Sequence, residues 1–249
     1  MARYQWLLFD ADGTLFDYER AEAAALACAF QQSGLPYQPD ILTAYRGFNQ
    51  RVWQWLENGQ TTPDRLKVQR FELLFAATGI RYSPADFSTV YLKCLGDCAE
   101  LMEGAREALD LLARFYRMAI LTNGLQAVQR PRLARSGIHS RISAIIISEE
   151  VGFAKPAKEF FDAAFARLGN PPKHAVLMIG DNWASDIQGA FRYGLDTCWF
   201  NPHHQPRPDN LKITREVASL WELTDWLGQA IACEIPSRSI RPAGENAKD

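Results

Sequence analysis

The sequence YQWLLFDADGT, residues 4–14, decides the fold of this chain. Its first part is a short apolar run, which predicts a buried β-strand at 4–9. The polar residues that follow predict a turn at the carboxyl end of this strand. Gly13 favours such a turn because glycine adopts backbone conformations that other residues avoid, and the turn would let Asp10 and Asp12 share one site.

Further apolar runs of the same kind follow along the chain, at 118–123, 143–148, 175–181 and 197–201. They are rich in β-branched or aromatic residues and become polar at their carboxyl ends, as buried strands of parallel sheets do. Helical patterns separate them, at 125–136, 157–168 and 184–193, and a glycine follows each. Alternating strands and helices require crossover connections, so the sequence predicts an α/β fold with a Rossmann-like, doubly wound parallel sheet.

A long segment between the first two strands interrupts this alternation. Residues 17–100 contain no convincing strand and show helical periodicity, which predicts helices at 19–33, 40–57, 63–78 and 84–99. Two more helices are expected, at 104–115 and 221–232. We therefore predict an α/β core of residues 1–16 and 101–233, a helical insertion of residues 17–100, and a disordered tail at 234–249, which is polar and aperiodic.

Composition and charge exclude several classes of protein. Hydrophobic residues make up 47% of the 249 residues and charged residues 22%, which is the balance of an ordinary soluble globule. The net charge of −2 provides no general basic field for a nucleic acid polymer or an anionic membrane, so local charges must meet any anionic ligand. No run approaches the roughly 18 apolar residues of a membrane span, and we expect a cytoplasmic protein.

The cysteines are expected to be free thiols. The five positions are an odd number in a chain too large to need disulfides, and no histidine lies near a pair of them at zinc spacing. They are Cys28, Cys94, Cys98, Cys198 and Cys233.

Polar segments whose side chains could take part in catalysis lie at or near the carboxyl ends of the predicted strands, where open α/β sheets bind their ligands. They are Asp10–Thr14, Thr122–Gly124, Lys155–Pro156 and Gly180–Asp186. Lys155 follows its strand by the seven-residue loop EEVGFAK, which could return it to the same edge of the sheet. Together the segments offer four carboxylates, an ammonium group and small hydrogen-bonding groups.

These residue types suit the transfer of a phosphoryl group. A hard divalent cation such as Mg²⁺ takes oxygen ligands, and Asp10 and Asp181 are candidates to hold it. The cation would draw an anionic phosphoryl group against Asp10, which could then act as a nucleophile. Asp12 suits proton transfer to the departing oxygen and later from the attacking water.

Donor groups must also surround the phosphoryl oxygens, because phosphoryl transfer is catalysed mainly by positioning and electrostatics. The Lys155 ammonium group, the Thr122 hydroxyl and the amides near Asn123 and Gly124 are candidates. Each of these motifs by itself is an ordinary turn or helix start, and their combination and order carry the hypothesis.

The segments together resemble the four motifs of the haloacid dehalogenase superfamily. The matching stretches are DADGT at 10–14, LTN at 121–123, AKP at 154–156 and GDNWASD at 180–186. The resemblance implies that Asp10 is the nucleophile and Asp12 the acid/base. It also implies that Asp10, the backbone carbonyl of Asp12, and Asp181 hold Mg²⁺, with Asp186 in an outer or water-mediated position. The helical insertion resembles the C1-type cap of subfamily I.

Within this superfamily, three stretches look closest to the pyrimidine 5'-nucleotidase branch. They are ISEEVGFAKP at 147–156, GDNWASDIQGA at 180–190 and TCWFN at 197–201. The resemblance implies a magnesium-dependent phosphomonoester hydrolase that acts on pyrimidine nucleoside monophosphates through a phospho-aspartate. Candidate substrate contacts are Asn123 and Gly124 in the core and Asn49, Trp53 and Arg70 in the insertion, whose side chains can stack on or hydrogen-bond a base.

Other functions remain open. A phosphatase of sugar phosphates or phosphoglycolate and a phosphomutase use the same residues. A haloacid dehalogenase needs no acid at the second aspartate position, so Asp12 argues against it, and a non-catalytic binding protein would not need the full set. We expect a small-molecule phosphomonoester as the partner, no nucleic acid polymer, no membrane, and a monomer or homodimer.

Overall fold

The structure is a computed structural model that describes residues 3–234, with side chains to residue 229. Its centre is a six-stranded sheet in the order β3-β2-β1-β4-β5-β6, and every pairing is parallel. The strands are Trp6–Phe9, Arg117–Thr122, Ala144–Ile147, Val176–Gly180, Asp196–Phe200 and Arg215–Val217, numbered β1 to β6. The predicted α/β class with a parallel sheet is confirmed, and the expected tail lies outside the described residues except for Glu234.

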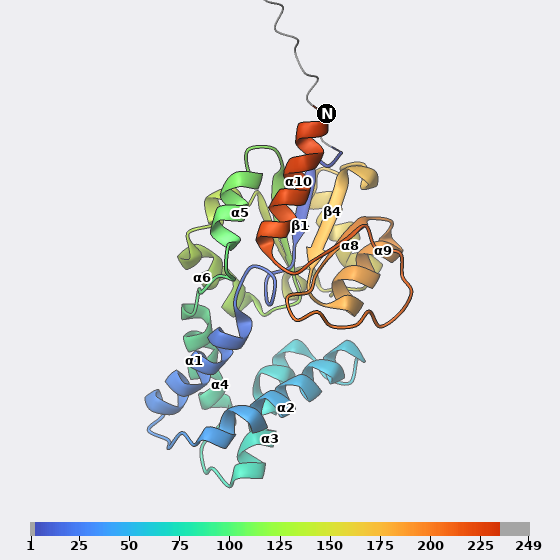
Figure 1. Ribbon diagram of the computed structural model, residues 1–249. Helices are drawn as coiled ribbons and strands as arrows, with labels where there is room; N and C mark the ends of the chain where they lie inside the picture. The colour runs from blue at the N-terminus through green and yellow to red at the C-terminus, as the bar shows by residue number, and fades with distance from the viewer. Residues whose placement is uncertain (1–2, 235–249) are drawn as a thin grey trace, which may run out of the picture.

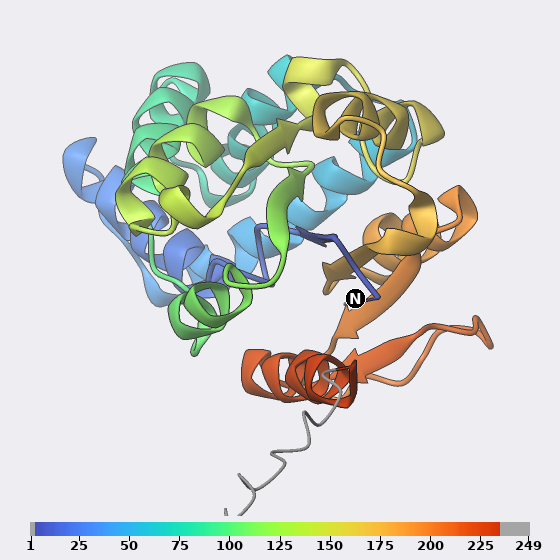
Figure 2. The ribbon, with the colours of Figure 1, turned by 90° about the horizontal axis from the view of Figure 1, so that it is seen from above.

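Alternate residues of the central strand face two different hydrophobic cores, because strand side chains point in turn to opposite faces. Leu7 and Phe9 of β1 face a core that includes α5 (Ala105–Leu112) and α10 (Leu220–Glu234). Trp6 and Leu8 face a second core with α8 (Lys158–Leu168) and α9 (Gly189–Tyr193). Figure 2 shows these helix pairs on the two sides of the sheet. The sheet is therefore buried on both faces, which explains its nearly uninterrupted apolar runs.

Two local features were missed by the sequence analysis. The edge strand β6 has a buried residue only at Val217, so it lacks the apolar run that identifies a buried strand. The segment predicted as one helix at 184–193 is a π-helical turn, Trp183–Gln188, followed by α9. π-helical turns are rare in proteins and often lie at functional sites.

Four helices pack together into a separate bundle, which we call the cap. They are α1 (Tyr18–Gln32), α2 (Pro39–Glu57), α3 (Pro63–Thr78) and α4 (Pro84–Asp97). Proline begins α2, α3 and α4, and the side chains of Thr62 and Ser83 accept hydrogen bonds from the first turns of α3 and α4. Their apolar faces form their own core, with clustered rings at Tyr45, Phe71, Phe87 and Tyr91. These bounds agree with the predicted helices to within two residues.

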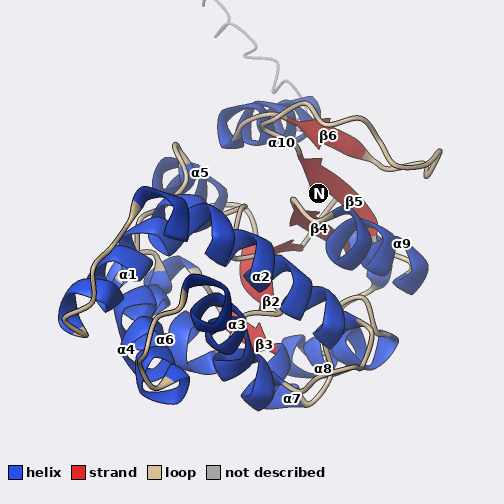
Figure 3. Cartoon of the chain, turned by 90° about the horizontal axis from the view of Figure 1, so that it is seen from below, coloured by secondary structure: helices blue, strands red, loops and turns tan. Residues whose placement is uncertain are grey.

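The cap lies across the carboxyl ends of the strands. Figure 1 shows it below the sheet, and the view from the cap side in Figure 3 shows α2 and α3 in front of the strand ends. The chain crosses between core and cap at Phe16–Asp17 and again at 98–102. The two crossings pair with each other: Phe16 forms an antiparallel bridge with Leu101, and the Asp17 N–H donates to the Glu100 carbonyl at 3.1 Å.

The expectation that all five cysteines are free thiols is wrong for Cys28 and Cys94. A disulfide joins them across α1 and α4, with their Cα atoms 6.3 Å apart. They are 66 residues apart in the sequence, so only the packing of the two helices brings them together. Cys98 and Cys198 are free, and the Cys233 side chain lies outside the described residues.

The helices give no sign of a membrane span. None of those in residues 3–234 combines the length and the apolar content needed to cross a bilayer.

Candidate active site

The polar segments found in the sequence meet at the carboxyl edge of the sheet, under the cap. β2, β1 and β4 are neighbours, so Thr122, Asp10 and Asp181 at their ends lie side by side. The chain order reverses direction between β1 and β4, which is where doubly wound sheets open a ligand crevice. Lys155 comes from further away, after β3 and a short helix, α7 (Ser148–Val151), which occupies part of the expected loop.

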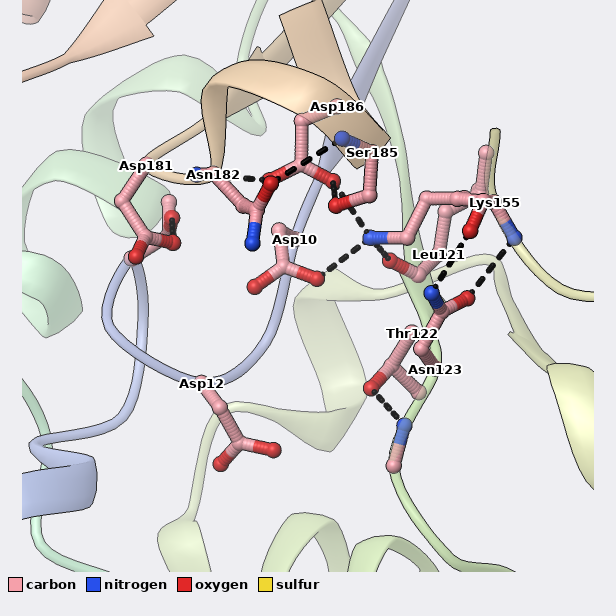
Figure 4. A network of polar contacts seen from close by, with 12 residues as sticks. Asp10, Asp12, Leu121, Thr122, Asn123, Lys155, Asp181, Asn182, Ser185 and Asp186 are labelled. Carbon is pink, nitrogen blue, oxygen red and sulfur yellow. Dashed lines mark hydrogen bonds and ion pairs between the residues drawn. The ribbon is translucent and has the colours of Figure 1, made fainter. Parts of the chain in front are cut away.

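Lys155 connects the carboxylates of this site (Figure 4). Its buried Nζ donates to Asp10 Oδ1 at 2.5 Å, to Asp186 Oδ1 at 2.7 Å and to the Leu121 carbonyl at 2.7 Å. All three ammonium protons are therefore used. Burial favours the neutral amine, but the charges of Asp10 and Asp186 outweigh it and raise the Lys155 pKa above its usual value.

Asn123 holds the backbone of Lys155. Its Oδ1 accepts from the Lys155 N–H at 2.8 Å, and its Nδ2 donates to the Lys155 carbonyl at 2.9 Å. The amide side chain thereby fixes Lys155 relative to the end of β2. The Asn123 side chain therefore positions Lys155. The substrate contact expected from the sequence for Asn123 stays a prediction.

The site holds more negative than positive charge. Carboxylate oxygens of Asp10, Asp181 and Asp186 lie within 4.8 Å of one another, and among the described side chains a single ammonium group, Lys155, bonds to them. Burial, opposed by Lys155 and reinforced by Asp186 and Asp181, raises the Asp10 pKa well above its usual value. Burial and the charge of Asp186 raise the Asp181 pKa to about 7. This set of oxygen ligands, with its excess of negative charge, suits a hard divalent cation.

The two motif glycines on either side of the cluster make room for its carboxylates. Gly13 has φ +84°, and a Cβ there would lie 2.6 Å from Asp181 Oδ2. A Cβ at Gly180 would lie 2.3 Å from Asp186 Oδ2. The turn expected at Gly13 is present, and Thr14 Oγ1 donates to Asp181 Oδ1 at 2.9 Å.

Asp186 is fully buried and held on both oxygens. Oδ1 accepts from Lys155, and Oδ2 accepts from the Asn182 N–H at 3.1 Å. Because both oxygens already have partners, Asp186 is better placed to orient Lys155 than to donate freely to a cation. The outer or water-mediated position that the sequence analysis expected for Asp186 stays a prediction.

Asp12 stands apart from this cluster. Figure 4 shows its carboxylate turned away from that of Asp10. Its two oxygens accept hydrogen bonds from Arg132 and Gln129, which both lie on α6 (Gln126–Ser136). The sequence analysis identified neither residue, because polar residues three apart on a helix are ordinary. The only available signal was that this helix follows the Thr122–Gly124 segment directly.

Thr122 and Gly124 close the site on the β2 side. Thr122 is buried, and its Oγ1 accepts from the Gly124 N–H at 2.9 Å. A Cβ at Gly124 would lie only 2.2 Å from Gln129 Nε2. The glycine therefore leaves the space through which Gln129 reaches Asp12.

Asn49 and Arg70, two of the three predicted cap contacts, lie in a buried polar network. Asn49 Nδ2 donates to the Tyr18 hydroxyl and to Glu22 Oε1, both at 3.2 Å, and Arg70 Nη1 donates to Asn49 Oδ1 at 3.2 Å. Arg70 Nη2 is buried and has no hydrogen-bond partner among the described residues. Trp53 is partly buried against the cap core.

Tyr18 lies between this network and the core. Burial and the neighbouring Tyr45 and Glu22 raise its pKa, and the charges of Arg70 on the cap side and Asp12 on the core side both act on it. The cap network and Asp12 therefore both lie within electrostatic range of Tyr18.

We expect Asp181→Asn to stabilise the metal-free protein. A carboxyl whose pKa is higher in the folded than in the unfolded chain costs stability when ionised. This cost is complete above pH 7 and disappears as the pH falls towards 4, since the Asp181 pKa is raised from 3.8 to about 7. With EDTA at pH 8, the free energy of unfolding of the variant should be about 2–4 kcal/mol higher than that of the wild type, and this gain should vanish near pH 4.

Thermal melts at both pH values measure this effect. Asp209→Asn is the matched control, because hydrogen bonds hold the Asp209 pKa below its usual value and neutralisation should bring no gain. A variant that melts at or below the wild-type temperature at pH 8 would show that ionised Asp181 does not destabilise the metal-free folded protein.

Comparison with known proteins agrees with this geometry. The family model for haloacid dehalogenase-like hydrolases matches residues 4–194. The HAD-hydrolase YfnB of Bacillus subtilis is 35% identical over 223 residues, which cover 90% of this chain and 95% of YfnB. Its crystal structure, bound to magnesium and described as revealing interdomain movement, superposes with a TM-score of 0.85 and covers 90% of this chain and 99% of that one.

Two curated relatives carry a named activity. Pyrimidine 5'-nucleotidase YjjG of Escherichia coli is 34% identical over 225 residues, or 90% of this chain and 98% of YjjG. Pyrimidine 5'-nucleotidase PynA of Streptococcus pneumoniae is 33% identical over 233 residues, or 93% of this chain and 98% of PynA.

Proposed function

This chain belongs to the haloacid dehalogenase-like hydrolases, and from that premise we propose that it is a magnesium-dependent phosphatase acting through a phospho-aspartate on Asp10. The observation that carries the proposal is the buried Asp10–Lys155–Asp186 arrangement with Asp181 beside it. It holds a nucleophilic carboxylate, a fixed cation and a second carboxylate within reach of one metal ion.

The proposed metal ligands are Asp10, Asp181 and the backbone carbonyl of Asp12, with Asp186 in an outer position. Mg²⁺ held there would neutralise charge on the phosphoryl group and on the attacking carboxylate. Lys155 places positive charge beside Asp10 independently of the metal, and its bonds to Asp186 and Leu121 keep it from moving away.

In the first step an Asp10 oxygen attacks phosphorus, and the bond from phosphorus to the ester oxygen breaks. The attacking and departing oxygens lie roughly in line, so the departing oxygen is on the far side of phosphorus from Asp10. We assign protonation of that oxygen to Asp12, whose carboxylate is turned away from that of Asp10 (Figure 4). In the second step water attacks the phospho-aspartate, Asp12 accepts its proton, and phosphate leaves with Asp10 regenerated.

Donors around the phosphoryl oxygens complete the site. The proposed donors are the Thr122 hydroxyl and the backbone amides at Asn123 and Gly124, of which the Gly124 N–H would exchange its bond to Thr122 Oγ1 for one to the substrate. Lys155 contributes positive charge, since its three protons are already used. Asp12 distinguishes this chemistry from dehalogenation, which needs no acid at that position. A phosphomutase would use the same residues and is separated from a phosphatase by its products.

The proposed substrates are pyrimidine nucleoside monophosphates. The cap covers the strand ends, so the site favours small esters over phosphorylated proteins. Asn49, Trp53 and Arg70 are the proposed cap contacts, as residues whose side chains can stack on or hydrogen-bond a base. The pyrimidine 5'-nucleotidase relatives support the same class. We also propose a cytoplasmic monomer or homodimer.

A substrate panel tests both the phosphatase assignment and the pyrimidine nucleotidase assignment. We expect UMP or dTMP to exceed AMP, glucose 6-phosphate and phosphoglycolate in kcat/KM by tenfold or more, about 1.4 kcal/mol of transition-state binding. Hydrolysis should require Mg²⁺ and stop with EDTA.

The outcomes separate the two assignments. If a sugar phosphate or phosphoglycolate leads every nucleotide by tenfold, the nucleotidase assignment falls and the phosphatase assignment stands. If none of the panel is hydrolysed with Mg²⁺, the phosphatase assignment falls as well. Release of an isomeric phosphate ester in place of inorganic phosphate would identify a mutase.

A further inference from the structure

Two fully buried polar side chains of α6 take no part in the mechanism above. Arg132 is 0% exposed and Gln129 is 1% exposed. Burying a guanidinium group costs several kcal/mol unless it is paired and hydrogen-bonded. A chain that places it beneath an active site must gain a specific contact there.

That contact is the carboxylate of Asp12. Arg132 Nη1 donates to Oδ1 and Gln129 Nε2 donates to Oδ2, the latter at 2.5 Å. The two residues are three apart and so share one face of the helix. Because each holds a different oxygen, they fix the rotation of the carboxylate as well as its place. A single partner would leave the rotation free.

The residues around Gln129 and Arg132 leave room for these hydrogen bonds to Asp12. The absence of a side chain at Gly124 provides the space for Gln129, as a Cβ would lie 2.2 Å from Nε2. Gln129 Oε1 and Arg132 Nη2 are both buried without a hydrogen-bond partner among the described residues. Leaving polar atoms unpaired costs stability, so the side chains are placed for Asp12 and not for their own complete hydrogen bonding.

Arg132 also touches both crossings between core and cap. Its Nε donates to the Cys98 carbonyl at 2.9 Å, and its guanidinium carbon lies 4.4 Å from the centre of the Phe16 ring. Phe16 belongs to the first crossing and Cys98 to the second. The same guanidinium group therefore joins Asp12 to the two chain segments on which the cap is mounted.

Resting on the phosphatase function above, we propose that Arg132 and Gln129 are positioning residues for Asp12. They orient its carboxylate towards the departing oxygen, and Arg132 fixes that orientation relative to the two crossings between core and cap. Their removal should weaken protonation of the leaving group and leave the attack by Asp10 and the binding of phosphate largely intact.

Leaving-group dependence tests this role. The variants are Gln129→Met, Arg132→Met and Arg132→Lys, each assayed on UMP and on p-nitrophenyl phosphate. The alkoxide leaving from UMP needs a proton, whereas nitrophenolate scarcely does. General acid catalysis contributes about 10²–10⁴ in rate, so we expect UMP hydrolysis to fall tenfold or more for Gln129→Met and Arg132→Met. The loss on p-nitrophenyl phosphate should stay within about threefold, with partial recovery in Arg132→Lys.

A double-mutant comparison with Asp12→Asn sharpens the test. If both residues act through Asp12, adding Gln129→Met or Arg132→Met to Asp12→Asn should lower kcat on UMP no further. Arg135→Met is the matched control, because Arg135 is on the same helix and pairs with Asp97 on the surface. It should leave both substrates unaffected.

Equal losses on the two substrates in folded variants would overturn the proposal, as would losses that multiply with that of Asp12→Asn. If Arg132→Met does not fold, Gln129→Met carries the test, since it removes no charge. If Asp12→Asn itself affects both substrates equally, the acid role of Asp12 fails, and the positioning role fails with it. If Asp12→Asn behaves as an acid variant but the α6 variants do not, only the positioning role fails.

Discussion

We expect Asp10→Asn to abolish hydrolysis of every phosphomonoester, with a loss of at least about 10⁴-fold in kcat. An amide is not a nucleophile, so no phospho-enzyme can form. The substitution also removes a charge from the proposed metal site. The fold should survive, because an asparagine oxygen can still accept from Lys155 and because the charge removed is one that burial and neighbouring carboxylates disfavour.

Two measurements check this result. Steady-state rates on UMP and p-nitrophenyl phosphate give the loss in kcat, and acid quenching with a labelled substrate should trap phospho-protein in the wild type and none in the variant. Asp17→Asn is the matched control. It lies in the same segment and caps α1 through its side chain, a role that asparagine also performs. More than a few per cent of wild-type turnover in EDTA-stripped Asp10→Asn would refute the covalent mechanism.

The second large effect is expected at Lys155. Lys155→Met should lower kcat by about 10²–10³-fold, with a smaller change in KM, because its charge stabilises the transferring phosphoryl group. It should also lower stability by about 3–5 kcal/mol, since Asp10 and Asp186 lose their buried partner. Kinetics at saturating UMP and thermal melts measure the two effects separately.

A double variant separates catalysis from folding. Lys155→Met with Asp186→Asn removes one of the unpaired charges, so melting temperature should partly recover while kcat stays low. Lys158→Met is the control, because Lys158 is an exposed lysine three residues away that pairs with Asp162. A return of kcat at saturating substrate, or recovery of kcat together with stability in the double variant, would mean that Lys155 serves only the fold.

Many helices and strands of the core and the cap could be predicted because they depend on short-range patterns. Strand β4 is five buried residues in a row, and helix α3 begins at Pro63 and ends before Gly79, as predicted. The position of Asp10 and Asp181 at the same edge of the sheet followed from the rule that parallel strands present their carboxyl ends at one edge, whereas only the structure made their strands neighbours. Strand β6 was missed because an edge strand needs few buried residues.

The cap shows what short-range patterns leave out. Its helices were predicted, but the buried network that joins Asn49 and Arg70, both proposed substrate contacts, to Tyr18 and Glu22 was not. A helical pattern shows which face of a helix is apolar. It does not show which polar side chains on neighbouring helices will bond to each other.

By itself the sequence determined the α/β class and the helical bundle between the first two strands, and it identified the residues proposed to carry phosphoryl transfer, because local periodicity and strand-end position encode them. Only the tertiary structure decided what those residues touch. Gln129 and Arg132 stand 117 and 120 residues from Asp12, and Cys28 stands 66 from Cys94. Such contacts depend on how helices pack against the sheet and against one another, and no pattern within a single segment contains that information.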